Sequence, residues 1–147
     1  MSIEKKLKSV TWNNIDEHVD NILKQFKGKK IDTILGLARG GVVPATMLAY
    51  RLDNNNLQQL GVRTRDVETT QFYGNPVLFG NILVVDDIND SGKTFYEVSK
   101  YLDYHFDRGE INEVIFSACS KRYNTKWSDG VYGTIIKDDE WLVYPWE

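Results

Sequence analysis

The chain has 147 residues, 41% of them hydrophobic and 12% aromatic, which is enough for one sizeable core and too few for two ordinary domains. Its 18 basic and 21 acidic residues give a net charge of −3, so the overall charge favours neither nucleic acid nor an anionic membrane surface as a partner. A single cysteine excludes an internal disulfide and a cysteine-built metal site, and no signal peptide or transmembrane helix is evident. We expect one domain over residues 1–147, located in the cytoplasm.

The first part of the chain predicts a helix, a strand and a second helix. Residues 14–26 place their apolar side chains at helical spacing, with Asn14 as the expected N-cap. Residues 31–38 form a short, largely apolar run that stops at a pair of glycines, which predicts a strand followed by a tight turn. Pro44 then suits the first turn of a helix that continues over residues 45–52.

The second part continues the alternation of strands and helices. A weaker strand is expected at 60–67 and a loop at 68–80, before a clear apolar strand at 82–85. A helical stripe over 95–106 and a buried strand over 114–118 follow. This alternation predicts a single α/β domain whose sheet is mostly parallel and is flanked by helices.

Three carboxylates, Asp86, Asp87 and Asp90, directly follow the apolar strand at 82–85. In open α/β sheets, ligands bind beyond the carboxyl ends of the strands, so the position suits a site. Carboxylates this close repel one another unless a cation or hydroxyl donors offset the repulsion. A ribose diol and Mg²⁺ would together offset it.

The turn after the acids has the groups that bind a phosphate monoester. It offers unpaired backbone N–H groups, two hydroxyls and the positive end of a helix dipole, and its glycine allows an anion to approach closely. The residues of this turn are Ser91, Gly92, Lys93 and Thr94. Carboxylates that could bind sugar hydroxyls therefore lie beside donors that could bind a phosphate, and a phosphorylated ribose requires both.

Other interpretations of this segment are simpler or belong to different folds. In the simplest one, Asp90 or Ser91 caps the next helix, while Asp86 and Asp87 are solvated turn residues. A P-loop requires a glycine where this chain has Asp87. The aspartate-rich motif of prenyl synthases has the same spacing but lies on helices, whereas these acids follow a strand.

Residues 85–94, Val-Asp-Asp-Ile-Asn-Asp-Ser-Gly-Lys-Thr, resemble the phosphoribosyl pyrophosphate motif of the type I phosphoribosyltransferases. Residues 10–12 and 37–44 are similar to the N-terminal part of bacterial xanthine-guanine phosphoribosyltransferases, and residues 141–147 to that family's purine-binding segment. The resemblance covers most of the chain in the family's order. It implies the type I phosphoribosyltransferase fold, with a small C-terminal or hood element.

The resemblance implies that a glycine loop holds the pyrophosphate through backbone N–H groups and a guanidinium. The residues of this loop are Ala38, Arg39, Gly40 and Gly41. Family members often have a non-proline cis peptide here, at 38–39 in this chain. The alternative is an ordinary glycine turn with a surface arginine.

The resemblance also gives each acid a role. Asp87 would reach Mg²⁺, with Glu147 as a second metal candidate unless the C-terminus is frayed. Asp86 would bind the ribose hydroxyls. Asp90 would exchange a proton with purine N7, while the carboxylates stabilise a sugar with oxocarbenium character.

For the base, the resemblance implies contacts from Lys121, Trp141 and Leu142. A lysine is a donor only, so it favours a 6-oxopurine over adenine, and the tryptophan would stack on the ring. The alternatives are a solvated lysine and a tryptophan packed in the core. His18 and His105 have no partner at catalytic spacing, so we expect them on the surface or in the core.

The implied reaction belongs to purine salvage. It joins guanine, xanthine or hypoxanthine to phosphoribosyl pyrophosphate with the help of Mg²⁺, and it releases pyrophosphate and a nucleoside monophosphate. Since relatives are dimers or tetramers, a homo-oligomer is expected. Two rivals stay open: a non-catalytic regulator that senses phosphoribosyl pyrophosphate or a nucleotide, and an enzyme acting on another base such as a pyrimidine.

One part of the family's pattern is missing. Family members have a mobile loop, opened by a Ser-Tyr pair, that closes over the active site and excludes water. Here residues 68–80 are short and lack that pair, with Phe72-Tyr73-Gly74 as the substitute that the sequence offers.

Overall fold

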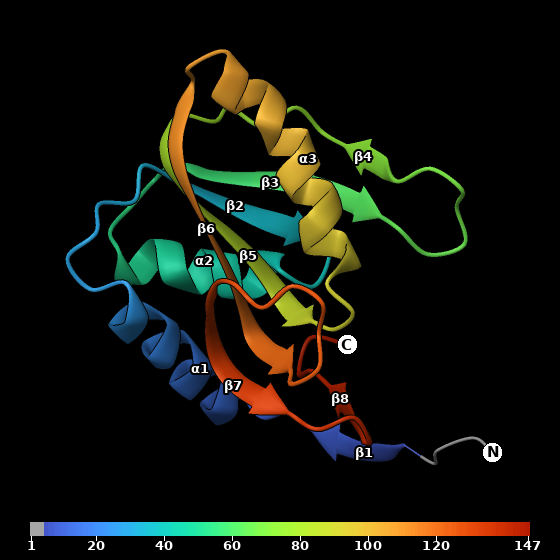
Figure 1. The fold of residues 1–147 in the computed structure, drawn as a ribbon. Coiled ribbons are helices and arrows are strands. Elements are labelled where there is room, and N and C mark those ends of the chain that lie inside the picture. Colours follow the sequence, from blue (N-terminus) through green and yellow to red (C-terminus); the bar gives the residue numbers. More distant parts are fainter. Residues whose placement is uncertain (1–4) are drawn as a thin grey trace.

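The structure, a computed structural model, describes residues 5–147 and consists there of a six-stranded sheet, three helices and a small two-stranded sheet (Figure 1). The six strands of the large sheet lie in the order β4-β3-β2-β5-β6-β7, and within it the β3–β4 pair is antiparallel while the other neighbours are parallel. The small sheet pairs β1 with β8 in parallel. In chain order the elements are β1 (Lys6–Ser9), α1 (Trp12–Gln25), β2 (Thr33–Ala38), α2 (Val42–Arg51), β3 (Leu57–Arg63), β4 (Gln71–Tyr73), β5 (Gly80–Asn89), α3 (Lys93–Asp107), β6 (Ile111–Arg122), β7 (Val131–Ile136) and β8 (Glu140–Val143).

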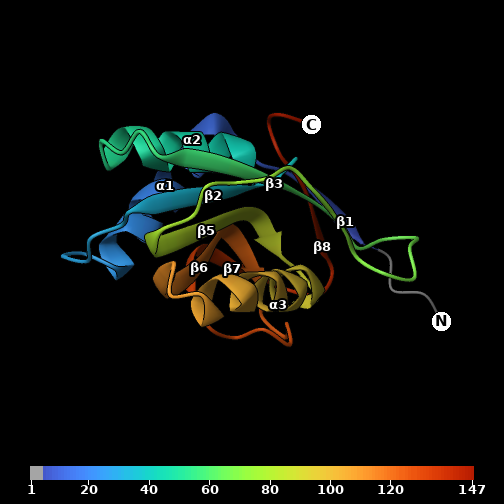
Figure 2. The ribbon, with the colours of Figure 1, turned by 90° about the horizontal axis from the view of Figure 1, so that it is seen from above.

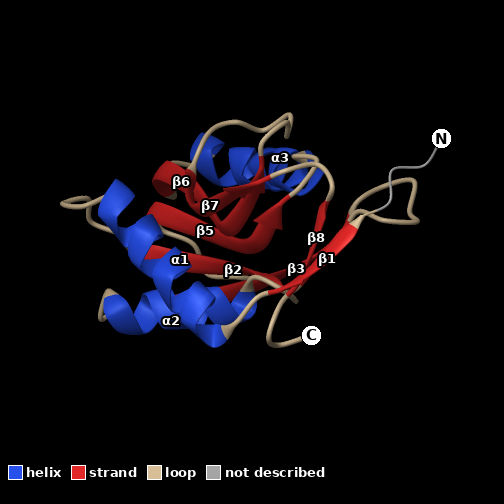
Figure 3. Cartoon of the chain, turned by 90° about the horizontal axis from the view of Figure 1, so that it is seen from below, coloured by secondary structure: helices blue, strands red, loops and turns tan. Residues whose placement is uncertain are grey.

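The helices cover both faces of the large sheet, with α1 and α2 on one face and α3 on the other (Figure 2 and Figure 3). The central strand β5 is buried on both sides. Leu83 and Val85 belong to the core under α1 and α2, and Ile82 and Val84 belong to the core under α3. A parallel strand covered on both faces has a continuous apolar run, as β5 does. The expected α/β class and mostly parallel sheet are confirmed.

The N-cap of α1 is Thr11, not Asn14 as expected from the sequence. The Asn14 amide donates to Thr11 Oγ1 at 3.1 Å, and the Asn14 side chain accepts from the Thr11 amide at 3.0 Å. This is a capping box in which asparagine fills the position that glutamate or glutamine usually takes. The prediction is wrong because asparagine is itself a common N-cap residue.

Several strand boundaries also differ from expectation. β3 ends at Arg63 rather than near residue 67, and the loop expected over 68–80 contains the short edge strand β4. β5 continues through the acids to Asn89 because its neighbour β6 runs equally far and pairs with it there. The strands β1, β7 and β8 are absent from the sequence prediction.

The small sheet ties the beginning of the described chain to its end. Its register pairs Leu7 with Trp141 and Ser9 with Val143. It corresponds to the small C-terminal element implied by the sequence resemblance, and Trp141 of β8 lines a cavity together with Asp87 and Asp90 of the acidic segment. Within residues 5–147, no helix is both long and apolar enough to cross a bilayer.

Candidate active site

Two adjoining cavities lie at the carboxyl ends of β2, β5 and β6. The first, called the loop cavity here, has a volume of about 800 Å³ and is lined by residues 64–68 and 86–95. The second, called the C-terminal cavity, has about 720 Å³ and is lined by the glycine loop after β2, the end of β6 and the last residues of the chain. Arg65, Asp87 and Asp90 line both cavities, so the two form one continuous site.

The acids Asp86 and Asp87 lie within β5 rather than in a turn after it. The amide of Asp87 donates to Asp86 Oδ1, and the amide of Ile88 donates to Asp87 Oδ1, both at 2.8 Å. Burial, together with the charge of Asp87, raises the pKa of the Asp86 carboxyl well above its usual range. The simple interpretation of these two residues as solvated turn acids is therefore wrong.

The turn after the acids contains Gly92, which is the N-cap of the 15-residue helix α3. Gly92 has φ +94, and a side chain there would place its Cβ 2.7 Å from the Trp127 amide nitrogen. Both the left-handed backbone and the close approach require glycine. Ser91 Oγ lies 3.3 Å from the Lys93 amide, whereas Asp90 makes no cap and pairs with another side chain.

Asn89, for which no role was expected from the sequence, holds this turn in place. Its side chain is buried and donates to the Trp127 carbonyl at 2.8 Å and to the Tyr132 hydroxyl at 2.9 Å, and it accepts from Thr125 Oγ1 at 2.9 Å. Asn89 thus joins the end of β5 to the segment between β6 and β7. The groups above it are held in place by this buried network.

The glycine loop after β2 packs directly against the acid-bearing strand. The Ala38–Arg39 peptide is cis, as the sequence resemblance led us to expect. A Cβ on Gly40 would lie 2.2 Å from Asp87 Oδ2, and one on Gly41 would lie 2.2 Å from the Val85 carbonyl oxygen. Only glycine fits at Gly41, where the neighbours are backbone atoms, whereas a Cβ at Gly40 would require the Asp87 side chain to shift. Arg39 and Gly40 line the C-terminal cavity, and the other two loop residues do not.

The C-terminal segment forms the opposite wall of the same cavity. Trp141 is 37% exposed there, with the Lys5 ammonium 5.0 Å from its ring centroid, and Leu142 is buried. The Tyr144 hydroxyl donates to the Asp87 carbonyl at 3.0 Å, and the backbone amide of Tyr144 lies 3.3 Å from Glu147 Oε1. Glu147 is therefore tied down and lines the cavity rather than being frayed.

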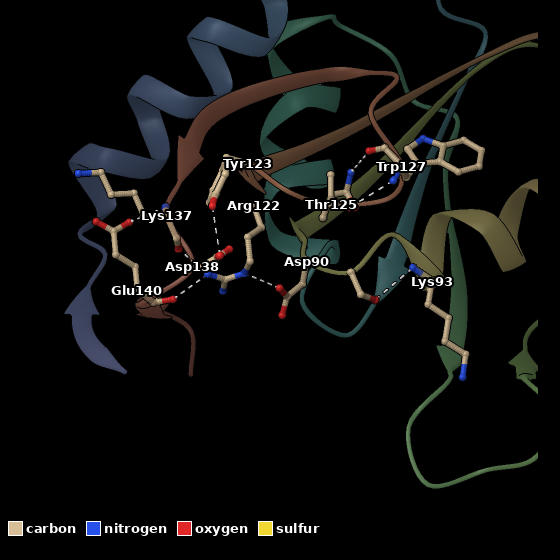
Figure 4. Close-up of polar contacts among 11 residues, drawn as sticks. Asp90, Lys93, Arg122, Tyr123, Thr125, Trp127, Lys137, Asp138 and Glu140 are labelled. Atoms are coloured by element: carbon tan, nitrogen blue, oxygen red, sulfur yellow. Dashed lines mark hydrogen bonds and ion pairs between the residues drawn. The ribbon is translucent and has the colours of Figure 1, made fainter. Parts of the chain in front are cut away.

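At the end of β6, the structure separates Lys121 from the other expected site residues. The Lys121 ammonium lies 3.3 Å from the Ser128 carbonyl and does not line either cavity. The next residue, Arg122, lines the C-terminal cavity, and its Nε donates to Asp90 Oδ1 at 2.5 Å (Figure 4). Successive side chains of a strand point to opposite faces, so a difference of one position moves a residue out of the site.

The carboxylates suit Mg²⁺ only in company with a phosphate ligand. Within residues 5–147 there is no cluster of three or more metal-ligating side chains. Asp87 and Glu147 nevertheless line the same cavity, and burial, followed by the charge of Asp87, raises the pKa of the neighbouring Asp86 carboxyl. Mg²⁺ commonly binds through one or two carboxylates plus phosphate oxygens, and this donor set fits that pattern.

The structure thus brings together most of the site residues expected from the sequence. The exception is Lys121. Sequence reasoning missed Arg65 and Arg122, which lie outside the recognised motifs, and it missed Asn89 and Tyr144, which lie within them but were given no role. The signal available for Arg122 was its position beside a lysine at a strand end, where the register decides which of the two cations faces the site.

Comparison with known proteins assigns the chain to a family. A model of the phosphoribosyl transferase domain matches residues 11–106, which include the glycine loop and the acid-bearing strand with its turn. The chain belongs to the type I phosphoribosyltransferase family. The enzyme class expected from the sequence is confirmed, and the fold around the site is that of the family.

Three relatives illustrate the range of the family. The chain is 26% identical over 152 residues to xanthine-guanine phosphoribosyltransferase from Cereibacter sphaeroides, covering 94% of this chain and 85% of that protein. It is 30% identical over 104 residues to the transcriptional regulator GfcR from Methanococcus maripaludis, covering 62% of this chain and 51% of the regulator. The crystal structure of purine phosphoribosyltransferase from Pyrococcus horikoshii matches with a TM-score of 0.79 at 23% identity, covering 96% of this chain and 94% of that one.

The remaining candidates from the sequence lie outside the site. His105 Nδ1 is 2.7 Å from Glu110 Oε2, and His18 is half-buried in α1; neither lines the two cavities. Cys119 is buried in β6, and burial together with the charges of Asp87 and Asp86 raises the pKa of its thiol. None of these three residues lines the loop cavity or the C-terminal cavity.

Proposed function

We propose that this phosphoribosyltransferase transfers the phosphoribosyl group of phosphoribosyl pyrophosphate to a 6-oxopurine, with Mg²⁺, and releases pyrophosphate. The observation that carries the proposal is the meeting of three kinds of group in one continuous site. They are the acids at 86–90, the anion-binding turn at 91–94 and the aromatic segment around Trp141. The substrates of this reaction need all three groups, because they comprise a phosphorylated sugar, a metal-bound pyrophosphate and a flat base.

The ribose 5′-phosphate fits the loop cavity. Residues 91–94 line that cavity at the start of α3, where the helix dipole and the first amides favour an anion. The left-handed Gly92 lets the phosphate approach the backbone. Asp86 and Asp87 follow on the same wall, so the hydroxyls of the sugar would meet carboxylates while its phosphate meets donors.

The pyrophosphate fits the junction of the two cavities. Arg39 and Arg65 come from separate loops and both line the C-terminal cavity together with Asp87. Guanidinium groups suit a dense anion because each presents several donors in a fixed plane. Mg²⁺, held by Asp87 with Glu147 on the same cavity, would neutralise the phosphate oxygens and orient the leaving group.

The base would stack on Trp141 and meet backbone groups at Leu142. As the bond between sugar and base forms, Asp90 takes the proton from purine N7, a contribution of roughly 10²–10⁴ in rate for general acid–base catalysis. The neighbouring carboxylates stabilise the positive charge that develops on the sugar. At the end of β6, the cation lining the cavity is Arg122 rather than Lys121.

A direct assay tests the proposal. The protein is mixed with phosphoribosyl pyrophosphate, Mg²⁺ and, separately, guanine, xanthine, hypoxanthine, adenine or uracil, and both pyrophosphate and nucleotide are measured. We expect product with at least one 6-oxopurine and none with adenine or uracil. Product from uracil or adenine alone would refute the assignment of the base site.

A second function is a non-catalytic regulator that keeps the phosphoribosyl pyrophosphate pocket as a sensor. It is favoured by the similarity to GfcR, although the chain spans about half of that regulator's length. The net charge of −3 gives little support for nucleic acid as the partner. Tight binding of phosphoribosyl pyrophosphate without product from any of the five bases would favour this function.

A further inference from the structure

Arg122 is a buried arginine that joins two parts of the site. Its side chain is 8% exposed, yet it lines the C-terminal cavity. Removing a guanidinium from water costs several kcal/mol unless its donors are paired, so the groups that it contacts define its role.

Those partners come from two separate segments (Figure 4). The Nε of Arg122 donates to Asp90 Oδ1 at 2.5 Å. Its Nη1 donates to the Lys137 carbonyl at 2.6 Å and to the Glu140 carbonyl at 3.1 Å. One side chain thus binds the acid loop after β5 and the turn between β7 and β8. A planar guanidinium can hold both sets of acceptors at once, whereas an ammonium is a single point charge.

Both segments belong to the proposed reaction. The 137–140 turn leads directly into Trp141 and Leu142, which would bind the base. Asp90 would handle the proton on N7. Within the described residues, Asp90 Oδ2 accepts no hydrogen bond, and the side chain is 36% exposed, so one carboxylate oxygen is fixed while the other is free to face a ligand.

We propose that Arg122 is a positioning residue that sets the Asp90 carboxylate at a fixed place relative to the base held by Trp141 and Leu142. The inference rests on the proposed transfer to a purine. It adds to that reaction a positioning residue that lies outside the recognised motifs. Because a misplacement of about 1 Å can cost 10²-fold in rate, a rigid link between the proton acceptor and the base segment has catalytic value.

A double-mutant cycle on Arg122 and Asp90 tests this role. The wild type, Arg122→Met, Asp90→Asn and the double variant are compared for kcat, for KM of the base and of phosphoribosyl pyrophosphate, and for binding of guanosine monophosphate by calorimetry. We expect Arg122→Met to lower kcat by about tenfold or more, since it weakens a general acid–base step, and to leave KM for phosphoribosyl pyrophosphate within about twofold. In the Asp90→Asn background the same change should lower kcat by less than about twofold, because residues that act through one another are not additive.

Arg108 supplies a matched control. Its Nε also donates to a carboxylate, Glu110 Oε1, at 2.7 Å, but this pair is exposed near the end of α3 and lines neither site cavity. Arg108→Met should leave all four measurements unchanged. If Arg122→Met fails to fold, Arg122→Lys replaces it in the cycle, since lysine keeps the charge but cannot hold both segments, and the same non-additivity is expected.

The outcomes separate this inference from the proposed function. Additive losses in the cycle would overturn the positioning role while the enzyme assignment stands, and so would a faster Arg122→Met, which would mean that the pair blocks Asp90. If the wild type makes no product with any base, the proposed function fails instead. The cycle is then judged on guanosine monophosphate binding, where non-additive weakening supports the link and additive weakening rejects it.

Discussion

The proposed phosphate side and the proposed base side of the candidate active site are built in different ways. The phosphate side is one continuous stretch, from the buried strand β5 through its acids to the start of α3. The base side is assembled from the end of β6, the 137–140 turn, β8 and the C-terminal residues, with β1 pairing alongside. A site made of one local segment is visible in the sequence, whereas an assembled one depends on how distant segments meet.

The end of β6 shows what this difference means. Lys121 and Arg122 are neighbouring cations at the end of β6, and the register of the strand determines that Arg122, and not Lys121, lines the cavity. A shift of one residue moves a side chain to the other face of a sheet. The sequence identifies the chemistry at this position but not the residue that carries it.

The largest expected effect is on the phosphate side, at Gly41. A Cβ there would meet three backbone atoms, 2.2 Å from the Val85 oxygen, 2.8 Å from Asp86 Cα and 2.9 Å from the Leu37 oxygen, and none of them can move aside alone. Gly41→Ala should therefore destabilise the protein by about 1–3 kcal/mol through overpacking. Displacing the glycine loop from the acids should lower kcat/KM for phosphoribosyl pyrophosphate by about 10²-fold.

Thermal unfolding and steady-state kinetics measure both consequences. Gly28→Asn is the control, because nothing lies within 4 Å of the Gly28 Cβ position, and asparagine tolerates the positive φ of this residue. Wild-type turnover in Gly41→Ala would contradict the close packing of the glycine loop on β5.

The next effect concerns Asp90, which belongs to both sides of the site. Asp90→Asn should leave binding of phosphoribosyl pyrophosphate largely intact and slow turnover by tenfold or more, about 1.4 kcal/mol of barrier. Calorimetry with phosphoribosyl pyrophosphate and single-turnover kinetics separate the two quantities. The exposed Asp103 on α3 gives a control substitution to asparagine, and an unchanged rate in Asp90→Asn would remove this carboxylate from the chemistry.

The contrast between one continuous segment and an assembly of distant segments also explains how much of the fold could be predicted from the sequence. β5 has a continuous apolar run because helices cover both of its faces, and the acids behind it mark the site. β7 and β8 give no comparable signal, since each is short and mixes buried with exposed residues. β8 is held by its pairing with β1, more than 130 residues earlier in the chain, as Trp141 with Leu7 shows.

Local hydrogen bonding sets a second limit on prediction. The cap of α1 depends on a reciprocal pair, Thr11 with Asn14, in which either residue is a plausible N-cap by type. Asn89 lies within the phosphoribosyl pyrophosphate motif, where no role was expected for it. Its buried side chain nevertheless forms hydrogen bonds with Thr125, Trp127 and Tyr132. Such roles arise from tertiary contacts, so residue type and spacing do not reveal them.

Two substitutions on the proposed base side compare a residue inside the C-terminal cavity with one outside it. Trp141→Ala should raise KM for the base by about tenfold, since stacking of a base on an aromatic ring is worth about 1–3 kcal/mol. Lys121→Met should change it by less than about twofold, because the Lys121 ammonium lies on the Ser128 carbonyl outside the cavity. Initial rates at varied base concentration measure both values. The opposite ranking would mean that Lys121 swings into the site and that the register of β6 does not determine the base contact.

The smallest expected effect is on stability, from a substitution at His18, which lies on α1 outside the candidate site. This histidine packs on Gly133 of β7, where a Cβ would fall 2.4 Å from His18 Cβ, and its Nδ1 is buried without a hydrogen-bond partner among the described residues. Burial lowers the pKa of His18, so the folded state favours the neutral ring. As the pH falls below about 6.5, the unfolded chain takes up a proton before the folded one does, and stability is lost from there down to the folded pKa. The melting temperature should therefore drop less between pH 7.5 and 5.5 in His18→Asn than in the wild type. An equal drop in His18→Asn would show that the contact of α1 with β7 does not depend on a neutral ring.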